Sequence, residues 1–177
     1  MEIPTITTER LCLRPFSPTN APTLHQIISG EDVLKYFPGS QPPTLEQVQK
    51  MITRLLDHWQ TYGYGLWAVT LPETGALMGR CGLQYLPETD EVEIDFIIDR
   101  RYWGRGFATE AGIASMKFGF ETLNLTSIVG IVHPDNVASQ RVLTKVGMQF
   151  VEKKVYFGMD CYRYVGKTAV FHPNFSN

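Results

Sequence analysis

The sequence of 177 residues has few cysteines and no pattern that would pair them. Cys12, Cys81 and Cys161 lie far apart and form no C-x-x-C motif. Neither a disulfide framework nor a zinc site is therefore predicted, and we expect no metal at the functional site. The odd number of cysteines fits a reducing compartment, so we expect a cytoplasmic protein.

An excess of charge of one sign and long apolar runs are also missing. Lys and Arg number 16 against 18 Asp and Glu, which gives a formal net charge of −2 at pH 7. This balance attracts neither nucleic acid nor anionic lipid, so we expect neither as a partner. No stretch approaches the roughly 18 consecutive apolar residues of a membrane helix. The first residues also lack the basic and apolar segments of a signal peptide.

The sequence does contain enough apolar material for one core. Hydrophobic residues make up 44% and aromatic residues 12% of the chain, and its length fits one ordinary domain. We predict a single domain over residues 1–170. The segment 171–177 has no periodicity, and we predict a loose C-terminal tail there.

Hydrophobic periodicity predicts an α/β protein with a mixed sheet, in the order β-α-α-β-β-β-α-β-α-β-β. The unit between residues 91 and 132 is a β-α-β crossover, which predicts a central pair of parallel strands. The predicted strands cover residues 9–14, 64–71, 77–85, 91–98, 127–132, 148–157 and 160–168. The predicted helices are a short one ending at Gly30, one following Pro43 with a Thr44/Gln47 capping box, one over 107–123 and one over 137–145.

The turn RYWGRG at residues 101–106 lies between a predicted strand and a predicted helix. A helix that begins directly after such a turn presents free backbone N–H groups and the positive end of its dipole, an arrangement that binds phosphate. Gly104 and Gly106 let the backbone approach an oxyanion closely, and the two arginines add charge. The dinucleotide fingerprint G-x-G-x-x-G is not matched, because Thr109 replaces its third glycine.

This turn resembles the [RQ]-x-x-G-x-[GA] signature of the GNAT superfamily of N-acetyltransferases. The run WGRGFATEA at 103–111 is similar to the branch that includes the RimJ and RimL ribosomal-protein acetyltransferases. NVASQRVLTKVGM at 136–148 resembles the branch's N-x-x-S-x-x-V-x-x-K-x-G-[FM] helix, and TERLCLR at 8–14 is typical of the same branch. The resemblance implies an acetyl-CoA-dependent N-acyltransferase, whose two central parallel strands separate to admit the pantetheine arm of coenzyme A.

The resemblance also implies where the cofactor binds. The strand edge at 96–98 would pair with the pantetheine amides, and the backbone amides of 103–108 would hold the pyrophosphate. Asn136 and Ser139 would face the pantetheine arm, although Asn136 also fits a plain helix N-cap. The cofactor-binding residues implied in this way are Phe96, Ile97, Ile98, Arg101, Trp103, Gly104, Arg105, Gly106, Phe107, Ala108, Thr109, Asn136 and Ser139.

Acetyl transfer to an amine needs a group that removes a proton near the thioester. Strand alternation places Glu91, Glu93 and Asp95 on one face, which either faces solvent or lines a site. Glu93 lies where several members of the superfamily keep a catalytic glutamate, so the resemblance implies that it is the general base. Many members have a tyrosine as the acid where this chain has Leu143, which leaves Ser139 as the candidate acid.

The expected acceptor is the primary amine of a small molecule or of a peptide N-terminus, which attacks directly in a ternary complex. If the three carboxylates line the cleft, an acceptor with further positive charge is favoured. The alternative is an acetyl-CoA sensor without turnover, and either a monomer or a homodimer is compatible. His133 could relay a proton, although a surface loop position is favoured for it. Candidate walls of the acceptor site, equally explained as core, are Tyr36, Phe37, Tyr62, Tyr64 and Trp67.

Overall fold

The computed structural model describes residues 2–39 and 41–171. The predicted tail therefore lies outside the described residues, apart from Phe171, whose ring packs on Phe120 with centroids 5.0 Å apart. The strands are β1 (Ile6–Thr7), β2 (Cys12–Arg14), β3 (Leu66–Thr70), β4 (Leu77–Leu86), β5 (Glu91–Ile98), β6 (Ser127–Val132), β7 (Gln149–Tyr156) and β8 (Met159–Lys167). The helices are α1 (Ala21–Ile28), α2 (Leu45–Tyr62), α3 (Phe107–Lys117) and α4 (Val137–Lys145).

The predicted order of elements is confirmed, with two differences of detail. The predicted strand 9–14 is shorter, and a two-residue strand, β1, precedes it and pairs with it. The predicted helix 107–123 is α-helical only as far as Lys117 and continues as a π-helical turn over Phe118–Thr122. Gly119 lies in that turn, where a Cβ would come within 2.6 Å of the Ile128 side chain, so the chain passes close to β6.

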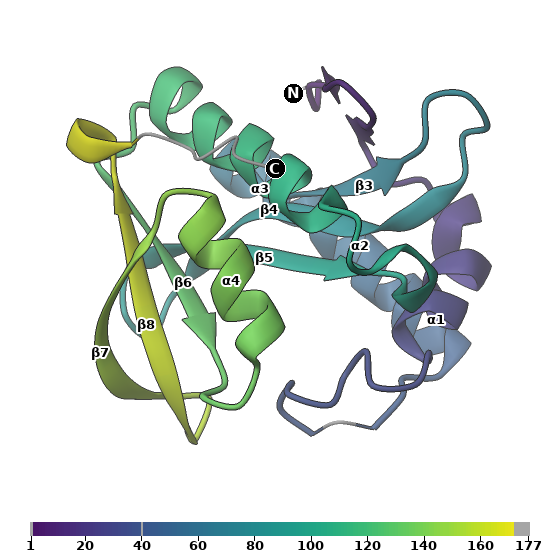
Figure 1. Cartoon of the computed structure of the whole chain (residues 1–177). Helices are drawn as coiled ribbons and strands as arrows, with labels where there is room; N and C mark the ends of the chain where they lie inside the picture. The colour runs from purple at the N-terminus through teal and green to yellow at the C-terminus, as the bar shows by residue number, and fades with distance from the viewer. Residues whose placement is uncertain (1, 40, 172–177) are drawn as a thin grey trace.

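One mixed sheet of eight strands runs in the order β1-β2-β3-β4-β5-β6-β8-β7. β5 pairs with β4 along its whole length, from Glu91 to Ile98. β5 and β6 are parallel, as predicted, but Glu93 and Val129 form their one registered pair. The two strands therefore separate toward the C-terminal end of β5, and Figure 1 shows them diverging. A parallel pair that opens in this way leaves backbone groups of β5 unpaired at the centre of the sheet.

Helices cover both faces of the sheet, with α1 and α2 on one side and α3 and α4 on the other (Figure 1). Alternate residues of β3 serve the two layers, because Ala68 packs with α1 and α2 whereas Trp67 packs in the cluster that contains α3. The start of α2 is fixed by the predicted capping box, in which Thr44 and Gln47 each bond the other's backbone N–H.

Candidate functional site

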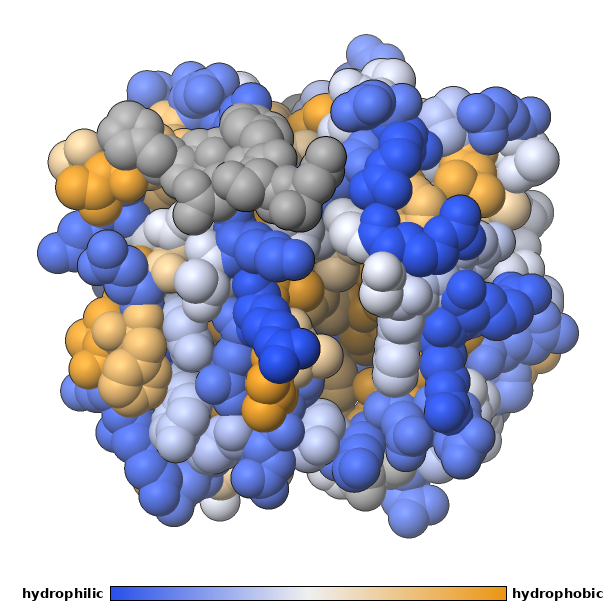
Figure 2. Space-filling model, in the orientation of Figure 1, coloured by the Kyte–Doolittle hydropathy of each residue, from blue (hydrophilic) through white to orange (hydrophobic). Residues whose placement is uncertain are grey.

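A groove of about 540 Å³ lies where β5 and β6 separate. Its walls are β5, the turn that leads into α3, the exposed face of α4 and the connection between α1 and α2. Figure 2 shows the hollow at the centre of this face, with an apolar floor and a hydrophilic rim. The predicted cofactor residues that line it are Phe96, Ile97, Ile98, Trp103, Gly104, Gly106, Phe107, Ala108, Thr109, Asn136 and Ser139.

The turn before α3 contributes two glycines to the lining of this groove. Gly104 and Gly106 have φ of 73° and 79°, in the left-handed region that favours glycine. A Cβ on Gly104 would meet no protein atom within 4 Å, so the space beside it is open. Gly106 is the N-cap of α3 and offers no side-chain bond to the first N–H groups of the helix. These donors and the helix dipole are suited to an anion such as a pyrophosphate.

The two arginines of the turn point elsewhere. Neither Arg101 nor Arg105 lines the groove. The Arg101 guanidinium donates to the Asp99 carboxylate, with Nη2 at 2.6 Å from Oδ2. Arg105 lies over the rings of Tyr102 and Phe107, at 5.8 and 5.0 Å from their centroids. The part of this turn that lines the groove is therefore formed by residues other than the two arginines.

The edge of β5 offers fewer free groups than the sequence predicted. The carbonyl oxygen of Ile98 accepts a hydrogen bond from the indole of Trp103 at 2.7 Å. The carbonyl oxygen of Ile97 lies against Gly79 of β4, because a Cβ on that glycine would collide with it. The carbonyl oxygens of both Ile97 and Ile98 are thus already engaged.

The N-terminal motif TERLCLR supports the turn from the side away from the groove. Arg10 Nη1 donates to the carbonyl oxygen of Arg105 at 2.9 Å, and its guanidinium lies 4.4 Å from the Phe107 ring centroid. Arg10 Nε and Thr8 Oγ1 donate to Glu110 of α3 at 2.7 and 2.6 Å. Burial alone would raise the pKa of Glu110, but the bonds from Thr8 and Arg10 hold it below its usual range. Sequence reasoning gave this motif no role, because its partners lie about a hundred residues away.

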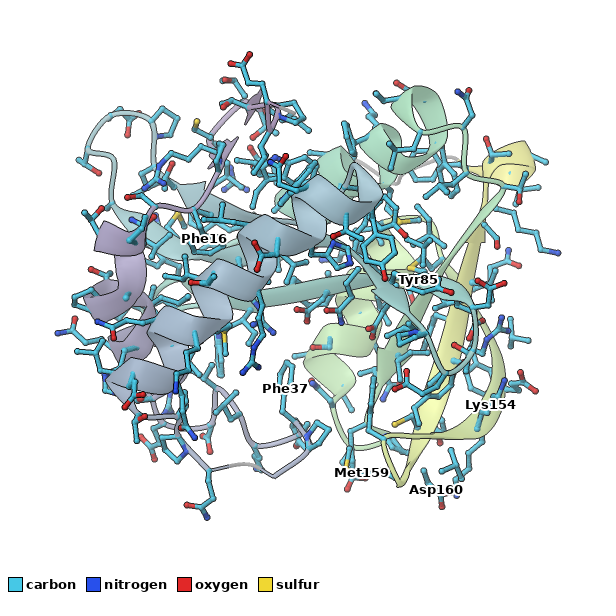
Figure 3. The ribbon with its side chains drawn as sticks, turned by 180° about the vertical axis from the view of Figure 1, so that it is seen from behind. Phe16, Phe37, Tyr85, Lys154, Met159 and Asp160 are labelled. Atoms are coloured by element: carbon cyan, nitrogen blue, oxygen red, sulfur yellow. The ribbon has the colours of Figure 1, made fainter. Side chains whose placement is uncertain are left out.

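A second cavity, of about 270 Å³, adjoins the groove at the point where β5 and β6 still pair. Both spaces are lined by Tyr36, Phe37, Phe96, Asn136 and Ser139. Phe37 reaches it from the α1–α2 connection, and Met159 reaches it from the start of β8 (Figure 3). Its other lining residues are Pro38, Arg80, Gln84, Glu93, Ile94, Asp95, Ile131, Val132, His133, Leu143, Phe157 and Cys161.

Glu93 is buried beside this cavity, and its residue surface is 6% exposed. The Gln84 side-chain amide donates to Glu93 Oε2 at 2.7 Å, and the backbone N–H of Ile131 donates to the same carboxylate. Burial raises the pKa of Glu93 to about 8, and the neighbouring charge of Asp95 acts in the same direction. The carboxyl group is therefore mostly protonated at pH 7. The sequence left open that Glu93 faces solvent, and that interpretation is wrong.

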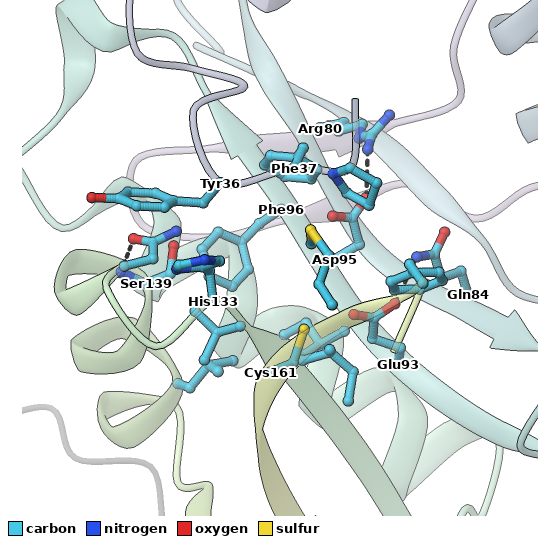
Figure 4. A pocket seen from close by; sticks show the side chains of 18 residues that line it. Tyr36, Phe37, Arg80, Gln84, Glu93, Asp95, Phe96, His133, Ser139 and Cys161 are labelled. Atoms are coloured by element: carbon cyan, nitrogen blue, oxygen red, sulfur yellow. Dashed lines mark hydrogen bonds and ion pairs between the residues drawn. The ribbon is translucent and has the colours of Figure 1, made fainter. Parts of the chain in front are cut away.

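The other two carboxylates of the strand are neutralised by arginines. Glu91 accepts from Arg163 Nη2 at 2.6 Å and lines neither space. Asp95 Oδ2 lies 2.8 Å from Arg80 Nη2, within the second cavity (Figure 4). The sequence predicted concentrated negative potential if the three carboxylates lined the cleft. That prediction is wrong, because arginines on β8 and β4 neutralise Glu91 and Asp95.

The start of α4 carries the predicted polar residues. Asn136 Oδ1 accepts from the Ser139 backbone N–H at 3.1 Å, so the N-cap role is confirmed. The Ser139 residue lines both spaces. Leu143 lies buried one turn further along and supplies no hydroxyl group. Ser139 is therefore the hydroxyl that α4 brings to the junction.

Two of the five aromatic residues that the sequence suggested as walls line the groove and the second cavity. Tyr36 and Phe37 line both spaces, whereas Trp67 is buried in the core and Tyr62 and Tyr64 pack against each other and His58. His133 lines the second cavity and stacks on Tyr36 with ring centroids 5.3 Å apart, so it is more than a loop residue. Its Nδ1 accepts from the backbone N–H of Asp135 at 3.1 Å.

Sequence reasoning missed Arg80, Gln84, Phe157, Met159 and Cys161 as cavity residues. A usable signal existed for Gln84, because the short turn after β4 sets a register in which Gln84 lies opposite Glu93. The described residues contain no group of three metal-ligating side chains placed to hold an ion. In the same part of the chain, no helix is long and apolar enough to cross a membrane.

Comparisons with known proteins agree on the family. The model of the acetyltransferase (GNAT) domain matches residues 10–149. The N-acetyltransferase p20 of Bacillus licheniformis is 32% identical over 146 residues, which cover 82% of each chain. The crystal structure of the acetyltransferase from Agrobacterium tumefaciens strain C58 is 29% identical and superposes with a TM-score of 0.83, covering 94% of this chain and 95% of that one.

The fold is also shared with more distant ribosomal-protein acetyltransferases. The RimL ribosomal L7/L12 alpha-N-protein acetyltransferase, solved in complex with coenzyme A, has a TM-score of 0.79 at 18% identity. It covers 93% of this chain and 98% of that chain. The resemblance found in the two sequence blocks is confirmed by these matches. The chain belongs to the acetyltransferase (GNAT) family, and it is an acetyl-CoA-dependent acyltransferase.

Proposed function

We propose that the protein transfers the acetyl group of acetyl-CoA to a primary amine by direct attack in a ternary complex, with Glu93 as the general base. The observation that carries the proposal is the position of Glu93, a buried carboxyl group with a pKa raised to about 8 beside a cavity that adjoins the cofactor groove. A module that only sensed acetyl-CoA would have no need of such a group. General bases work best when their pKa lies near the operating pH.

The groove residues would hold the cofactor so that its thioester faces the second cavity. The backbone N–H groups of residues 103–108 would bind the pyrophosphate, and Phe96 would pair with the pantetheine arm opposite Ser139. Bound acetyl-CoA supplies the thioester carbon that the amine attacks. The junction shared by both spaces is then where the amine and the thioester meet.

Glu93 would take the proton that the amine loses. With a pKa of about 8, about a tenth of the Glu93 side chains are ionised at pH 7. Gln84 and the backbone N–H of Ile131 hold the carboxylate by donating to it, so its position does not depend on an arginine. Ser139 would protonate the departing sulfur, although a thiolate with a pKa near 8.5 also leaves without an acid.

Replacing Glu93 by Gln should abolish most turnover and spare cofactor binding. The amide keeps the volume and can still accept from Gln84, but it removes no proton. We expect kcat to fall about 100-fold or more, while the Kd for acetyl-CoA changes less than about twofold. Glu91→Gln is the matched control, since it alters the same strand outside both cavities and should keep kcat within about threefold. Equal rates for the two variants would contradict the assignment of the base.

As pH rises, the activity of the protein should increase, whereas its stability against unfolding should decrease. For the parent, kcat/KM should rise as pH passes through about 8 and level off about one pH unit higher, as Glu93 becomes ionised. Its folded pKa lies above the ordinary value of 4.5, so the stability it contributes is complete below that value and is lost as pH rises through about 8. In thermal unfolding, the melting temperature of Glu93→Gln relative to that of the parent should therefore rise from about pH 5 to about pH 9. If both proteins lost stability to the same extent over this pH range, the raised pKa of Glu93 would be contradicted.

Gly104→Val should weaken acetyl-CoA binding without unfolding the protein. The new side chain would occupy the open space beside the turn, where the pyrophosphate must approach. We expect Kd to rise at least about tenfold, or about 1.4 kcal/mol, in calorimetry. Gly75→Val carries the same backbone strain at φ of 70°, also in open space but distant from the groove, and should leave Kd unchanged. A similar Kd for both variants would place the pyrophosphate elsewhere.

Arg10→Met should weaken the cofactor specifically through its pyrophosphate. The variant leaves the Arg105 carbonyl and the Glu110 charge without their partner. We expect KM for acetyl-CoA to rise roughly fivefold. S-acetylpantetheine, which lacks the pyrophosphate, should be used equally well by variant and parent. Arg14→Met is the control, because Arg14 binds Pro15 and Asn20 instead of the turn. Equal losses with both thioesters would show a general structural defect.

A further inference from the structure

We propose that the acceptor is a small monoamine with an apolar body, and that Arg80 disfavours polycationic amines by masking the charge of Asp95. This inference rests on the proposed function, whose acceptor it names more closely. It follows from the size of the second cavity, from the chemistry of its walls and from the way its charges are paired.

The cavity has room for a small molecule and walls that suit an apolar one. Its volume of about 270 Å³ lies just below the usual range for ligand pockets. The rings of Tyr36, Phe37 and Phe96 lie on the side opposite Cys161 (Figure 4). Phe157 and Met159 of the β7–β8 turn add further apolar surface. An acceptor bound here would bury its carbon atoms against these side chains.

The charges of the cavity cancel inside it. The side chains of Arg80 and Asp95 are 13% and 10% exposed, and Nη2 and Oδ2 lie 2.8 Å apart. Asp95 Oδ2 is buried and accepts no hydrogen bond, so its interaction with Arg80 is the ion pair alone. Because the two charges are opposite and close together, the pair has no net charge and acts on a third group only as a dipole. Glu93 adds little at pH 7, because its carboxyl group is mostly protonated there.

The Arg80–Asp95 pair would disfavour charged acceptors, because such acceptors lose their hydration water on entering the cavity. A second ammonium group entering the cavity would give up its water and find no unpaired carboxylate, which is costly. On Arg80, Nη2 pairs with Asp95 and Nη1 is directed at the Met51 sulfur at 3.3 Å, so a carboxylate on the acceptor would find only the buried Nε without a hydrogen-bond partner. The reacting amine loses its charge when it gives its proton to Glu93 in the ionised fraction of the protein, whereas a second ammonium group keeps its charge. Selectivity against both kinds of charged acceptor thus depends on one ion pair.

Two matched pairs of acceptors test the idea in the full-length protein. Pentylamine and 1,5-diaminopentane differ by one ammonium group, and 2-phenylethylamine and phenylalanine differ by one carboxylate. For the parent we expect kcat/KM, measured by thiol release from acetyl-CoA, to favour the monoamine at least about tenfold in each pair. A parent preference for the diamine, for phenylalanine or for a peptide N-terminus over the monoamines would overturn the inference.

Variants that unmask each charge make the test specific. Arg80→Met should narrow or invert the preference against 1,5-diaminopentane, and Asp95→Asn should do the same for phenylalanine. The double variant Arg80→Met/Asp95→Asn is neutral again and should recover the parent's preferences. Arg163→Met unmasks Glu91 outside the cavity and should change neither ratio. Unchanged ratios in every folded variant would also overturn the inference, and Asp95→Asn alone suffices if Arg80→Met does not fold.

Binding separates this inference from the proposed function. Calorimetry with the same four amines, on protein saturated with coenzyme A, reports on the cavity without turnover. The monoamines should bind more tightly than their charged counterparts. If they do while no amine is acetylated, the proposed function fails and the inference about the cavity stands. If the charged counterparts bind more tightly, the inference fails even where acetylation is observed.

Discussion

The separation of β5 from β6 beyond Glu93 is the constraint on which the rest of the site depends. Adjacent strands normally satisfy each other's backbone groups, and here the pairing stops after one registered pair. The indole of Trp103 satisfies the carbonyl of Ile98, and the remaining edge opens into the groove. Because α3 begins beside the same opening, its N-terminal N–H groups and the free edge of β5 face one space. A backbone-binding cofactor can therefore be recognised without any side chain of fixed identity.

Three carboxylates spaced by two along β5 have different environments because different strands lie beside them. Glu91 receives Arg163 from β8, Asp95 receives Arg80 from β4, and Glu93 receives Gln84. A guanidinium partner favours the ionised carboxylate. An amide orients the carboxyl group without supplying the charge that would keep it ionised. Glu93, the carboxylate with an amide partner, is also buried, and burial raises its pKa to about 8.

The elements that the sequence predicted best are those with local signals at both ends. α4 begins and ends as predicted, since Asn136 caps it and Gly147 follows it with a φ of 94°. β5 and β6 also match, as does the turn between β5 and α3. The prediction of negative potential on one face of β5 failed for a different reason. Strand alternation assigns Asp95 to a face, but the arginine that neutralises it comes from another strand. Pairings such as that of Arg10 with Glu110 have no local signature either.

The shared residues at the junction decide which substitutions can separate the two halves of the reaction. Phe96, Asn136 and Ser139 line both the groove and the second cavity. A change at any of them would alter the support of the thioester and the wall of the acceptor site together. Gly104 lines the groove alone, whereas Glu93 lines the second cavity alone. Losses confined to cofactor affinity in one and to turnover in the other would therefore be informative, because the two residues line different spaces.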